Sequence, residues 1–280
     1  MKVRSFDQDK AILYLVGTPI GNLEDMTFRA IKILKSVDKI YAEDTRTSGV
    51  LLKYYDIHTK VESYHEFNQD LKSEQILNEL KSGCKLALIS DAGLPVISDP
   101  GYKLVSLAIE NHIAVSTIPG ASAGISALIA SGLAPMPYTF FGFLDSKTTK
   151  RIKQLEEIKY NPHTIIFYEA PHRIEKTLED MRFVLGNRRI VLARELTKTF
   201  EEFARGTIEE ILLELPLKGE MVLLVEGYQE QEEVSNPFLK IDELISLGYK
   251  PNEAIKEIAR QTQMNRNELY KSYINFKNEK

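Results

Sequence analysis

Three short segments combine glycine with proline, and one of them adds two carboxylates, in a way that suits a ligand pocket. They read GTPIGN (17–22), SDAGLPVISDPG (90–101) and IPGASAG (118–124), and each follows a strand-like apolar run. Glycine permits positive φ and lets backbone N–H and C=O groups approach a ligand closely, while proline fixes the path of the turn. If the three turns meet at one sheet edge, they form a pocket lined by backbone.

The charges in these turns favour a cationic ligand over a phosphate. Neither G-x-G-x-x-G nor G-x-x-x-x-G-K-[ST] occurs, and Asp91 and Asp99 of the second turn would repel pyrophosphate. A ligand with a ribose, a heteroaromatic base and a positive charge fits better, and S-adenosylmethionine has all three. The two aspartates could also bind a metal, but no third ligand stands at a suitable spacing, so no metal is expected.

An alternation of strand-like and helix-like segments places these turns. Apolar runs predict strands at 12–16, 39–42, 85–89, 113–117, 164–168, 190–194 and 220–225. Apolar residues at three-to-four spacing predict helices at 27–36, 70–81, 102–111, 121–131 and 174–184. This alternation is typical of an α/β protein with mainly parallel sheets, whose ligands bind beyond the carboxyl ends of the strands.

Composition limits the classes of protein that remain. The chain has 280 residues, 43% of them hydrophobic and 27% charged, which is typical of a globular protein with two domains. A net charge of -4 gives no overall basic field, so an RNA partner would have to be held by a local patch. The single cysteine, Cys84, excludes an internal disulfide and a multi-cysteine zinc site. The amino terminus lacks the apolar core of a signal peptide, so a cytoplasmic location is expected.

The domain boundaries follow from breaks in pattern and composition. Residues 113–144 carry no charged side chain, but prolines break this segment before it reaches the roughly 20 residues needed to cross a bilayer, so no membrane span is expected. We expect an α/β domain with glycine and proline loops at 1–124, a second α/β domain at 125–230, and a linker with a helical tail at 231–280. Two short helices are predicted in the tail, at 251–263 and 264–276, which serves either as a docking element or as a helix-turn-helix contact with nucleic acid.

Long motifs of the chain resemble a known family. They read LYLVGTPIGNLEDMTFRAIKILKSVDKIYAEDTR, LISDAGLPVISDPG, IPGASAGISALIASGL, FYEAPHRIEKTLEDM and ARELTKTFEEFARGT. Together they are similar to the ribosomal RNA small subunit methyltransferase I family, which shares its fold with the tetrapyrrole methylases. The resemblance implies two α/β domains with the donor S-adenosylmethionine between them, usually in a homodimer. It also implies 2'-O-methylation of a cytidine ribose in the decoding centre of 16S rRNA, and the near-neutral charge favours the assembled 30S subunit over naked rRNA as substrate.

The resemblance also implies which residues bind the donor. Matching the family's motifs to this sequence gives Pro19, Gly93, Leu94, Pro95, Ile97, Ser122, Ala123, Glu169, Ala170, Gly206 and Thr207. Two positions depart from the family. Leu94 stands where most relatives have threonine, which removes one possible hydroxyl contact, and Asp145 replaces a proline two residues before Lys147.

Methyl transfer to a ribose hydroxyl sets the requirements for the remaining residues. The 2'-oxygen, the methyl carbon and the sulfur must lie in line, and this alignment lowers the activation barrier by about 7 to 11 kcal/mol. A base, or a cation that stabilises the alkoxide, raises the rate by a further factor of about 100 to 10,000. The catalytic candidates are Lys198, Glu195 and Asp44, and the RNA-binding candidates are Arg46, Lys147, Arg173 and Arg194. Guanidinium groups suit phosphate oxygens because they bind them bidentately.

Several of these residues have a structural alternative. Asp44 or Thr45 could cap a helix, and Arg194 with Glu195 could form an ion pair at a strand end. The aromatic cluster Phe140, Phe141 and Phe143 is assigned to the core rather than to base stacking. Two other functions stay open: a methylase of a tetrapyrrole or similar small molecule, and a nucleic-acid-binding adaptor whose loops are only structural.

Overall fold

The chain forms two compact units, each of which we describe by itself. The computed structural model describes residues 11–215, 218–230, 236–262 and 264–278. The larger unit spans Met1–Tyr228 and the smaller one Gln229–Lys280. No helix in these described ranges has both the length and the apolar character that a membrane crossing requires.

The first sheet of the larger unit is parallel throughout. Its strand order is β3-β2-β4-β1-β5. The strands are β1 (Ile12–Val16), β2 (Lys39–Ala42), β3 (Val61–Ser63), β4 (Lys85–Ile89) and β5 (Ala114–Ile118). Helices lie on both faces, as expected for a parallel sheet that is buried on both sides.

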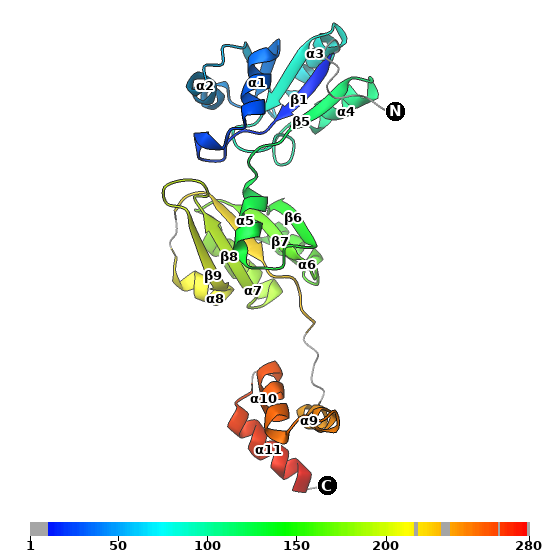
Figure 1. The fold of residues 1–280 in the computed structure, drawn as a ribbon, viewed down its shortest axis with the longest axis vertical. Coiled ribbons are helices and arrows are strands. Elements are labelled where there is room, and N and C mark those ends of the chain that lie inside the picture. The colour runs from blue at the N-terminus through cyan, green and yellow to red at the C-terminus, as the bar shows by residue number, and fades with distance from the viewer. Residues whose placement is uncertain (1–10, 216–217, 231–235, 263, 279–280) are drawn as a thin grey trace. The chain divides into compact units, whose positions relative to one another are not determined.

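Four helices cover this sheet, two on each face. They are α1 (Phe28–Ser36), α2 (Thr45–Tyr54), α3 (Gln69–Lys81) and α4 (Tyr102–Glu110), and a short 3-10 turn, η1 (Leu23–Asp25), precedes α1. In Figure 1, α1 and α2 lie on one side of β1 and β5, and α3 and α4 on the other. Thr27 begins α1 by accepting the backbone N–H of Ala30 at 3.1 Å, after which Ala30 and Leu34 turn one face inward at i, i+4 spacing.

The second sheet is mixed, with strand order β6-β7-β10-β8-β9. Its strands are β6 (Tyr138–Phe143), β7 (Thr164–Glu169), β8 (Arg189–Arg194), β9 (Glu202–Thr207) and β10 (Met221–Val225). Only the β6–β7 pairing is parallel; β10 runs antiparallel to both of its neighbours, and β9 folds back on β8. The expectation of mainly parallel sheets is therefore confirmed for the first sheet and wrong for the second, because β10 inserts between β7 and β8.

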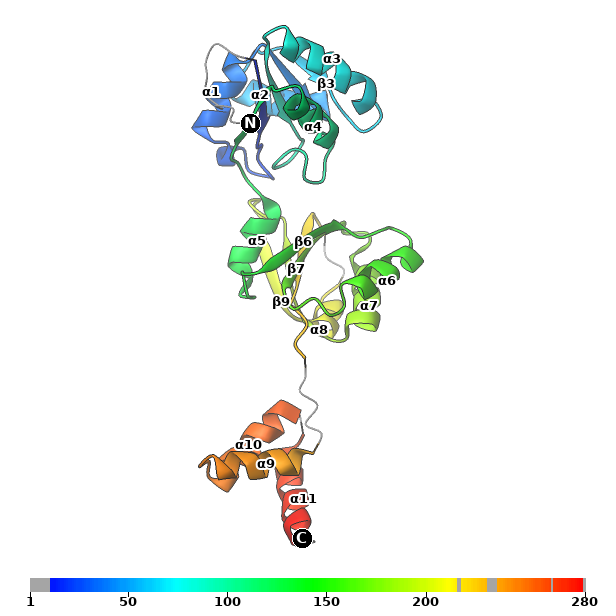
Figure 2. The same cartoon turned by 90° about the vertical axis from the view of Figure 1, so that its right-hand side faces the viewer.

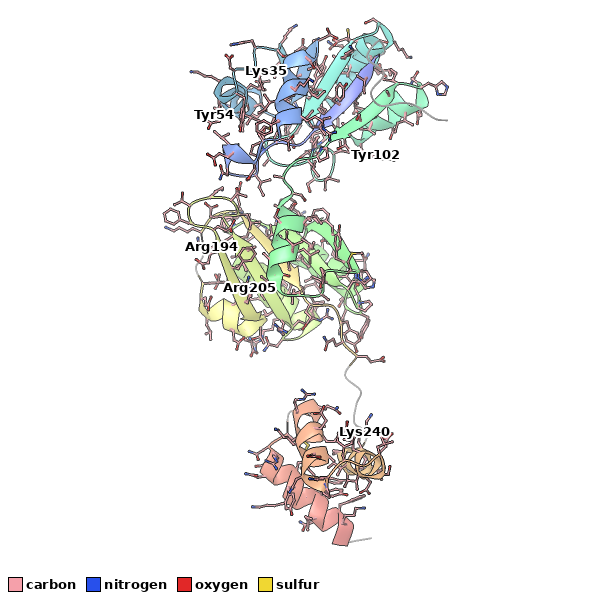
Figure 3. All side chains as sticks on the ribbon, viewed as in Figure 1. Lys35, Tyr54, Tyr102, Arg194, Arg205 and Lys240 are labelled. Carbon is pink, nitrogen blue, oxygen red and sulfur yellow. The ribbon has the colours of Figure 1, made fainter. Side chains whose placement is uncertain are left out.

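Helices also cover both faces of the second sheet. They are α5 (Ala123–Ser131), α6 (Thr148–Glu157), α7 (Ile174–Leu185) and α8 (Ile208–Leu213). In Figure 2, α5 lies on one side of β6 and β7, and α6 and α7 lie on the other. Arg205 of β9 fixes the end of α5 by donating to the carbonyl oxygens of Ala130 and Ser131 at 2.7 and 3.1 Å (Figure 3).

The described residues of the smaller unit form a cluster of three helices. They are α9 (Pro237–Ser246), α10 (Pro251–Thr262) and α11 (Arg266–Asn278), so the two predicted helices are present and α9 is an additional one. Asn236 caps α9 by accepting the N–H of Phe238 at 3.0 Å, and Ile241, Ile258 and Leu269 are fully buried between the helices.

Candidate functional site

The turns after β1, β4 and β5 are hydrogen-bonded to one another. Thr18 and Gly93 form an antiparallel bridge, in which Thr18 N–H donates to Gly93 O at 2.9 Å and Gly93 N–H donates to Thr18 O at 3.2 Å. Gly17 N–H donates to Ile118 O at 3.1 Å, which links the first turn to the third. The predicted meeting of the three turns at one sheet edge is confirmed.

This close approach depends on glycine. A Cβ atom built on Gly17 would lie 2.8 Å from Gly120 Cα, so the two backbone segments are in direct contact. Gly93 has φ +80°, a left-handed conformation that side chains other than glycine rarely adopt. The sequence therefore places glycine where two turns touch and where the second turn reverses.

A cavity of about 390 Å³ opens beside these turns. Its size falls within the range of small-molecule sites. Residues of both sheets of the larger unit line it, and seven of the predicted donor-binding residues are among them: Gly93, Leu94, Ile97, Ser122, Ala123, Glu169 and Ala170. Predicted residues from three separate segments of the sequence thus meet at one place.

Four predicted donor-binding residues do not line the cavity. Pro19 and Pro95 are buried next to lining residues, where they shape the turns. Gly206 and Thr207 lie farther away, because they pair with Ile190 and Arg189 at the start of β8, whereas the cavity lies beyond the end of that strand.

Thr207 has a clear structural task. Its hydroxyl accepts the N–H of Glu210 at 3.3 Å, and the Glu210 carboxylate accepts the Thr207 N–H at 2.7 Å, which together form a capping box at the start of α8. We expect Thr207→Ala to lower the free energy of unfolding by about 1 kcal/mol, because an orphan N–H of the first turn loses its acceptor. Donor affinity measured by calorimetry should stay at the wild-type value. Weaker donor binding by the variant would show that Thr207 does contribute to the donor site.

Other lining residues were not among those predicted to bind the donor, although several of them lie within the quoted motifs. They include Ile20, Tyr168, Ala193, Leu196 and Val222. Three of them follow from strand alternation, since Tyr168, Ala193 and Val222 share the face of the second sheet that α5 covers. Leu196 could not be found this way, because Glu195 and Thr197 on either side of it have φ values of 49° and 68°.

Lys198 is held at the edge of the cavity by two carboxylates. Its ammonium nitrogen lies 3.0 Å from Glu195 Oε1 and 3.0 Å from Glu220 Oε2, and Glu220 lines the cavity. The Lys198 stem covers Gly21, where a Cβ atom would meet Lys198 Cγ at 2.8 Å. Burial lowers the pKa of Lys198, but the hydrogen bonds to both carboxylates outweigh it and raise the pKa above its ordinary value. Lys198 is therefore a cation at neutral pH.

Glu195 serves as the anchor of this lysine. Its Oε1 also accepts the backbone N–H of Glu220 at 3.0 Å. The hydrogen bond from Lys198, followed by that backbone contact, lowers the pKa of Glu195. A carboxylate held ionised in this way is a weak proton acceptor, so its geometry suits positioning of Lys198.

Several carboxylates lie near the second turn, and one of them lines the cavity. Asp99 lines the cavity, and burial raises its pKa, with a further increase from the charge of Asp91. Burial also raises the pKa of Glu43, and Asp99 and Asp91 add to that effect. Asp44 differs: its hydrogen bonds with Arg46 lower its pKa to about 2, and it caps α2 by accepting the Arg46 N–H at 2.8 Å. The helix-cap alternative for Asp44 is confirmed.

The four predicted RNA-binding side chains have different surroundings. Arg46 is 91% exposed and pairs with Asp44, and Lys147 is exposed at the start of α6. Arg173 points inward, donating to the carbonyl oxygens of Leu144 and Asp145 at 2.7 and 3.2 Å, and its Nε lies 3.3 Å from Glu169 Oε1.

Arg194 is occupied by partners within the chain. At the end of β8 (Figure 3), it lies 2.6 Å from Glu202 Oε2 and donates to Lys218 O at 3.3 Å. Arg194 does form an ion pair at a strand end, but the predicted partner is wrong: Arg194 pairs with Glu202, whereas Glu195 pairs with Lys198.

Comparison with known proteins gives a consistent family. The family model described as Tetrapyrrole (Corrin/Porphyrin) Methylases matches residues 12–212. The chain is 52% identical over 287 residues to the ribosomal RNA small subunit methyltransferase I of Streptococcus pyogenes serotype M1, which covers 98% of this chain and 99% of that protein. It is 47% identical over 276 residues to the protein of the same name from Bacillus subtilis (strain 168), which covers 95% of this chain and 94% of that protein.

Solved structures of lower identity share the fold. A diphthine synthase superposes with a TM-score of 0.61 at 13% identity, covering 77% of this chain and 89% of that one. The uroporphyrin-III-C-methyltransferase of Thermus thermophilus superposes with a TM-score of 0.57 at 16% identity, covering 78% and 94%. By sequence and by fold, the chain belongs to the ribosomal RNA small subunit methyltransferase I family within the tetrapyrrole methylases.

Proposed function

We propose that this protein is an S-adenosylmethionine-dependent methyltransferase that 2'-O-methylates the ribose of a decoding-centre cytidine in 16S rRNA. The observation that carries the proposal is the cavity at the meeting point of the three glycine turns, in a chain about half of whose residues are identical to relatives named for methylation of small-subunit ribosomal RNA. An adaptor would not need such a cavity.

The residues that line the cavity fit this donor. Gly93 and the contact between Gly17 and Gly120 leave backbone where side chains would otherwise fill the space, and Asp99 and Glu220 place carboxyl groups beside a cationic ligand. We propose that Gly93, Leu94, Ile97, Ser122, Ala123 and Ala170 hold the donor. S-adenosylmethionine supplies an electrophilic methyl group when bound. Glu169 also lines the cavity, and its buried carboxylate accepts from Thr177 Oγ1 at 2.6 Å, which fixes this part of the wall.

Different residues at the cavity stabilise the charge on the 2'-oxygen and accept the proton of its hydroxyl group. Lys198 is a cation whose role is to stabilise the negative charge that develops on the 2'-oxygen, and Glu195 positions it. Among the carboxyl groups with a raised pKa, Asp99 lines the cavity, so we assign to it the acceptance of the hydroxyl proton. Asp44 contributes indirectly, by starting α2 and pairing with Arg46.

The substrate and partners follow from the same surfaces. Arg46 and Lys147 are exposed cations suited to RNA phosphates, and with a net charge of -4 the assembled 30S subunit is the proposed substrate.

Ile129 on α5 is 77% exposed, and we propose that a second copy of the chain covers it in a homodimer. We also propose a cytoplasmic location, and domains at 1–124 and 125–230, since Ala127 and Leu128 of α5 pack on the second sheet.

Labelled methyl transfer tests the proposed function. Purified protein with labelled donor should methylate 30S subunits lacking the modification faster than free 16S rRNA, and nuclease digestion should yield one labelled 2'-O-methylcytidine. Label on a base, or none on RNA despite calorimetric donor binding, would contradict the RNA ribose assignment. No heat with the donor or its demethylated product would favour an adaptor.

A further inference from the structure

Phe143 is an exposed aromatic side chain at the cavity. It is 56% exposed, it lines the cavity, and its ring contacts that of Tyr168 edge-on, with centroids 5.5 Å apart at 63°. The expectation that Phe140, Phe141 and Phe143 all belong to the core is therefore wrong for Phe143. An apolar ring left in solvent beside a ligand cavity marks a surface that a partner covers.

A β-bulge aims this ring at the cavity. Phe140 pairs with Ile166 and Gly142 with Phe167, so Phe141 is an extra residue in β6, and Gly142 has φ +81°. Phe141 packs on the face that α7 covers, against Phe167 at 5.3 Å. With regular alternation, Phe143 would face the same way as Phe141; the bulge turns it to the face of Tyr168 instead.

The segment after Phe143 is fixed by two guanidinium groups. Arg173 donates to Leu144 O at 2.7 Å and to Asp145 O at 3.2 Å, and Arg151 donates to Asp145 O and Ser146 O, both at 3.2 Å. Arg151 is itself buried and pairs with Asp180. The exposure of Phe143 therefore belongs to a rigid segment and not to a loose loop.

We propose that the base of the target nucleotide stacks on Phe143, whose ring Tyr168 supports edge-on, so that the two residues form one wall. This inference rests on the proposed function and deepens it, by assigning the RNA base a place at the exposed Phe143 ring, beside the lining residues proposed to hold the donor. An exposed ring offers a π face, and aromatic side chains commonly hold unstacked RNA bases in this way. The Tyr168 hydroxyl accepts the Gly124 N–H at 3.3 Å, which leaves its own proton free to donate to a base edge.

Steady-state kinetics with 30S subunits test whether the target base stacks on Phe143. Stacking is worth about 1–3 kcal/mol per base, so Phe143→Ala should lower kcat/KM for subunits by about 5- to 150-fold. Donor affinity by calorimetry should be unchanged, and Phe143→Trp should restore kcat/KM because it keeps a π face. Phe183→Ala is the matched control, since Phe183 on α7 is 78% exposed and does not line the cavity.

Fluorescence gives a readout that does not depend on turnover. The chain contains no tryptophan, so Phe143→Trp and Phe183→Trp each introduce a single fluorophore. Titration with 16S rRNA should quench the emission of the first variant and not of the second. Equal quenching of both, or an unchanged kcat/KM in Phe143→Ala, would overturn the stacking wall. Failure of the wild-type protein to methylate 30S subunits would instead overturn the proposed function.

Discussion

Gly17→Ala is expected to weaken donor binding by about 10- to 100-fold. The added Cβ would lie 2.8 Å from Gly120 Cα and 3.0 Å from Gly120 N, and backbone cannot move aside as a flexible side chain can. The first and third turns must separate, at a cost of about 1–3 kcal/mol for overpacking. The same separation disturbs the Thr18–Gly93 bridge and with it the wall of the cavity. Calorimetry with the donor and chemical denaturation measure the two effects.

Gly49→Ala is the matched control for that substitution. Gly49 lies within α2, and a Cβ atom there meets nothing within 4 Å. Alanine should therefore raise the free energy of unfolding by about 0.5–1 kcal/mol through helix propensity and leave donor affinity unchanged. Wild-type donor affinity in a destabilised Gly17→Ala variant would show that the donor binds elsewhere.

Lys198→Met is expected to lower turnover by about 100- to 1,000-fold, the usual cost of removing one preorganised donor from a developing oxyanion. Methionine keeps an unbranched side chain over Gly21 while removing the charge that two carboxylates hold at the cavity edge. Because the lost interaction acts on charge that appears only in the transition state, donor affinity should change by less than about threefold. Single-turnover methylation of 30S subunits separates the chemical step from binding.

Lys35→Met serves as the control for loss of one positive charge. Lys35 lies exposed on α1 (Figure 3), and its removal should leave turnover unchanged. If Lys198→Met also turned over at the wild-type rate, the alkoxide would be stabilised by another group. A drop in donor affinity as large as the drop in turnover would assign Lys198 to donor binding instead.

The sequence predicts the first sheet better than the second for a physical reason. Buried parallel strands such as β1 and β4 are continuous apolar runs, which are easily recognised. β3 has only three half-buried residues, and β9, EFARGT, is an edge strand with polar side chains, so neither has a clear apolar pattern. β10 has the clearest apolar run of all, but pairing direction is set by tertiary packing and not by its own residues.

At the site too, some residues can be predicted from the local sequence, whereas others depend on tertiary packing. The three glycine turns could be predicted because a glycine in the sequence indicates a close backbone approach or a positive φ at that same residue. Gly206 and Thr207 were expected at the donor from the family resemblance, yet β9 carries the chain from the end of β8 at Arg194 back to its start at Arg189. Phe143 is misassigned because a one-residue bulge reverses the face that alternation predicts.

The antiparallel insertion of β10 has a consequence for synthesis of the protein. Because β10 runs opposite to β7 and β8, its first residues, Met221 and Val222, lie beside the last residues of those strands and complete the wall of the cavity. A nascent chain that has emerged only as far as β9 has all three glycine turns but lacks the central strand of its second sheet. The cavity is therefore complete only after translation has passed residue 225 and that strand has left the exit tunnel.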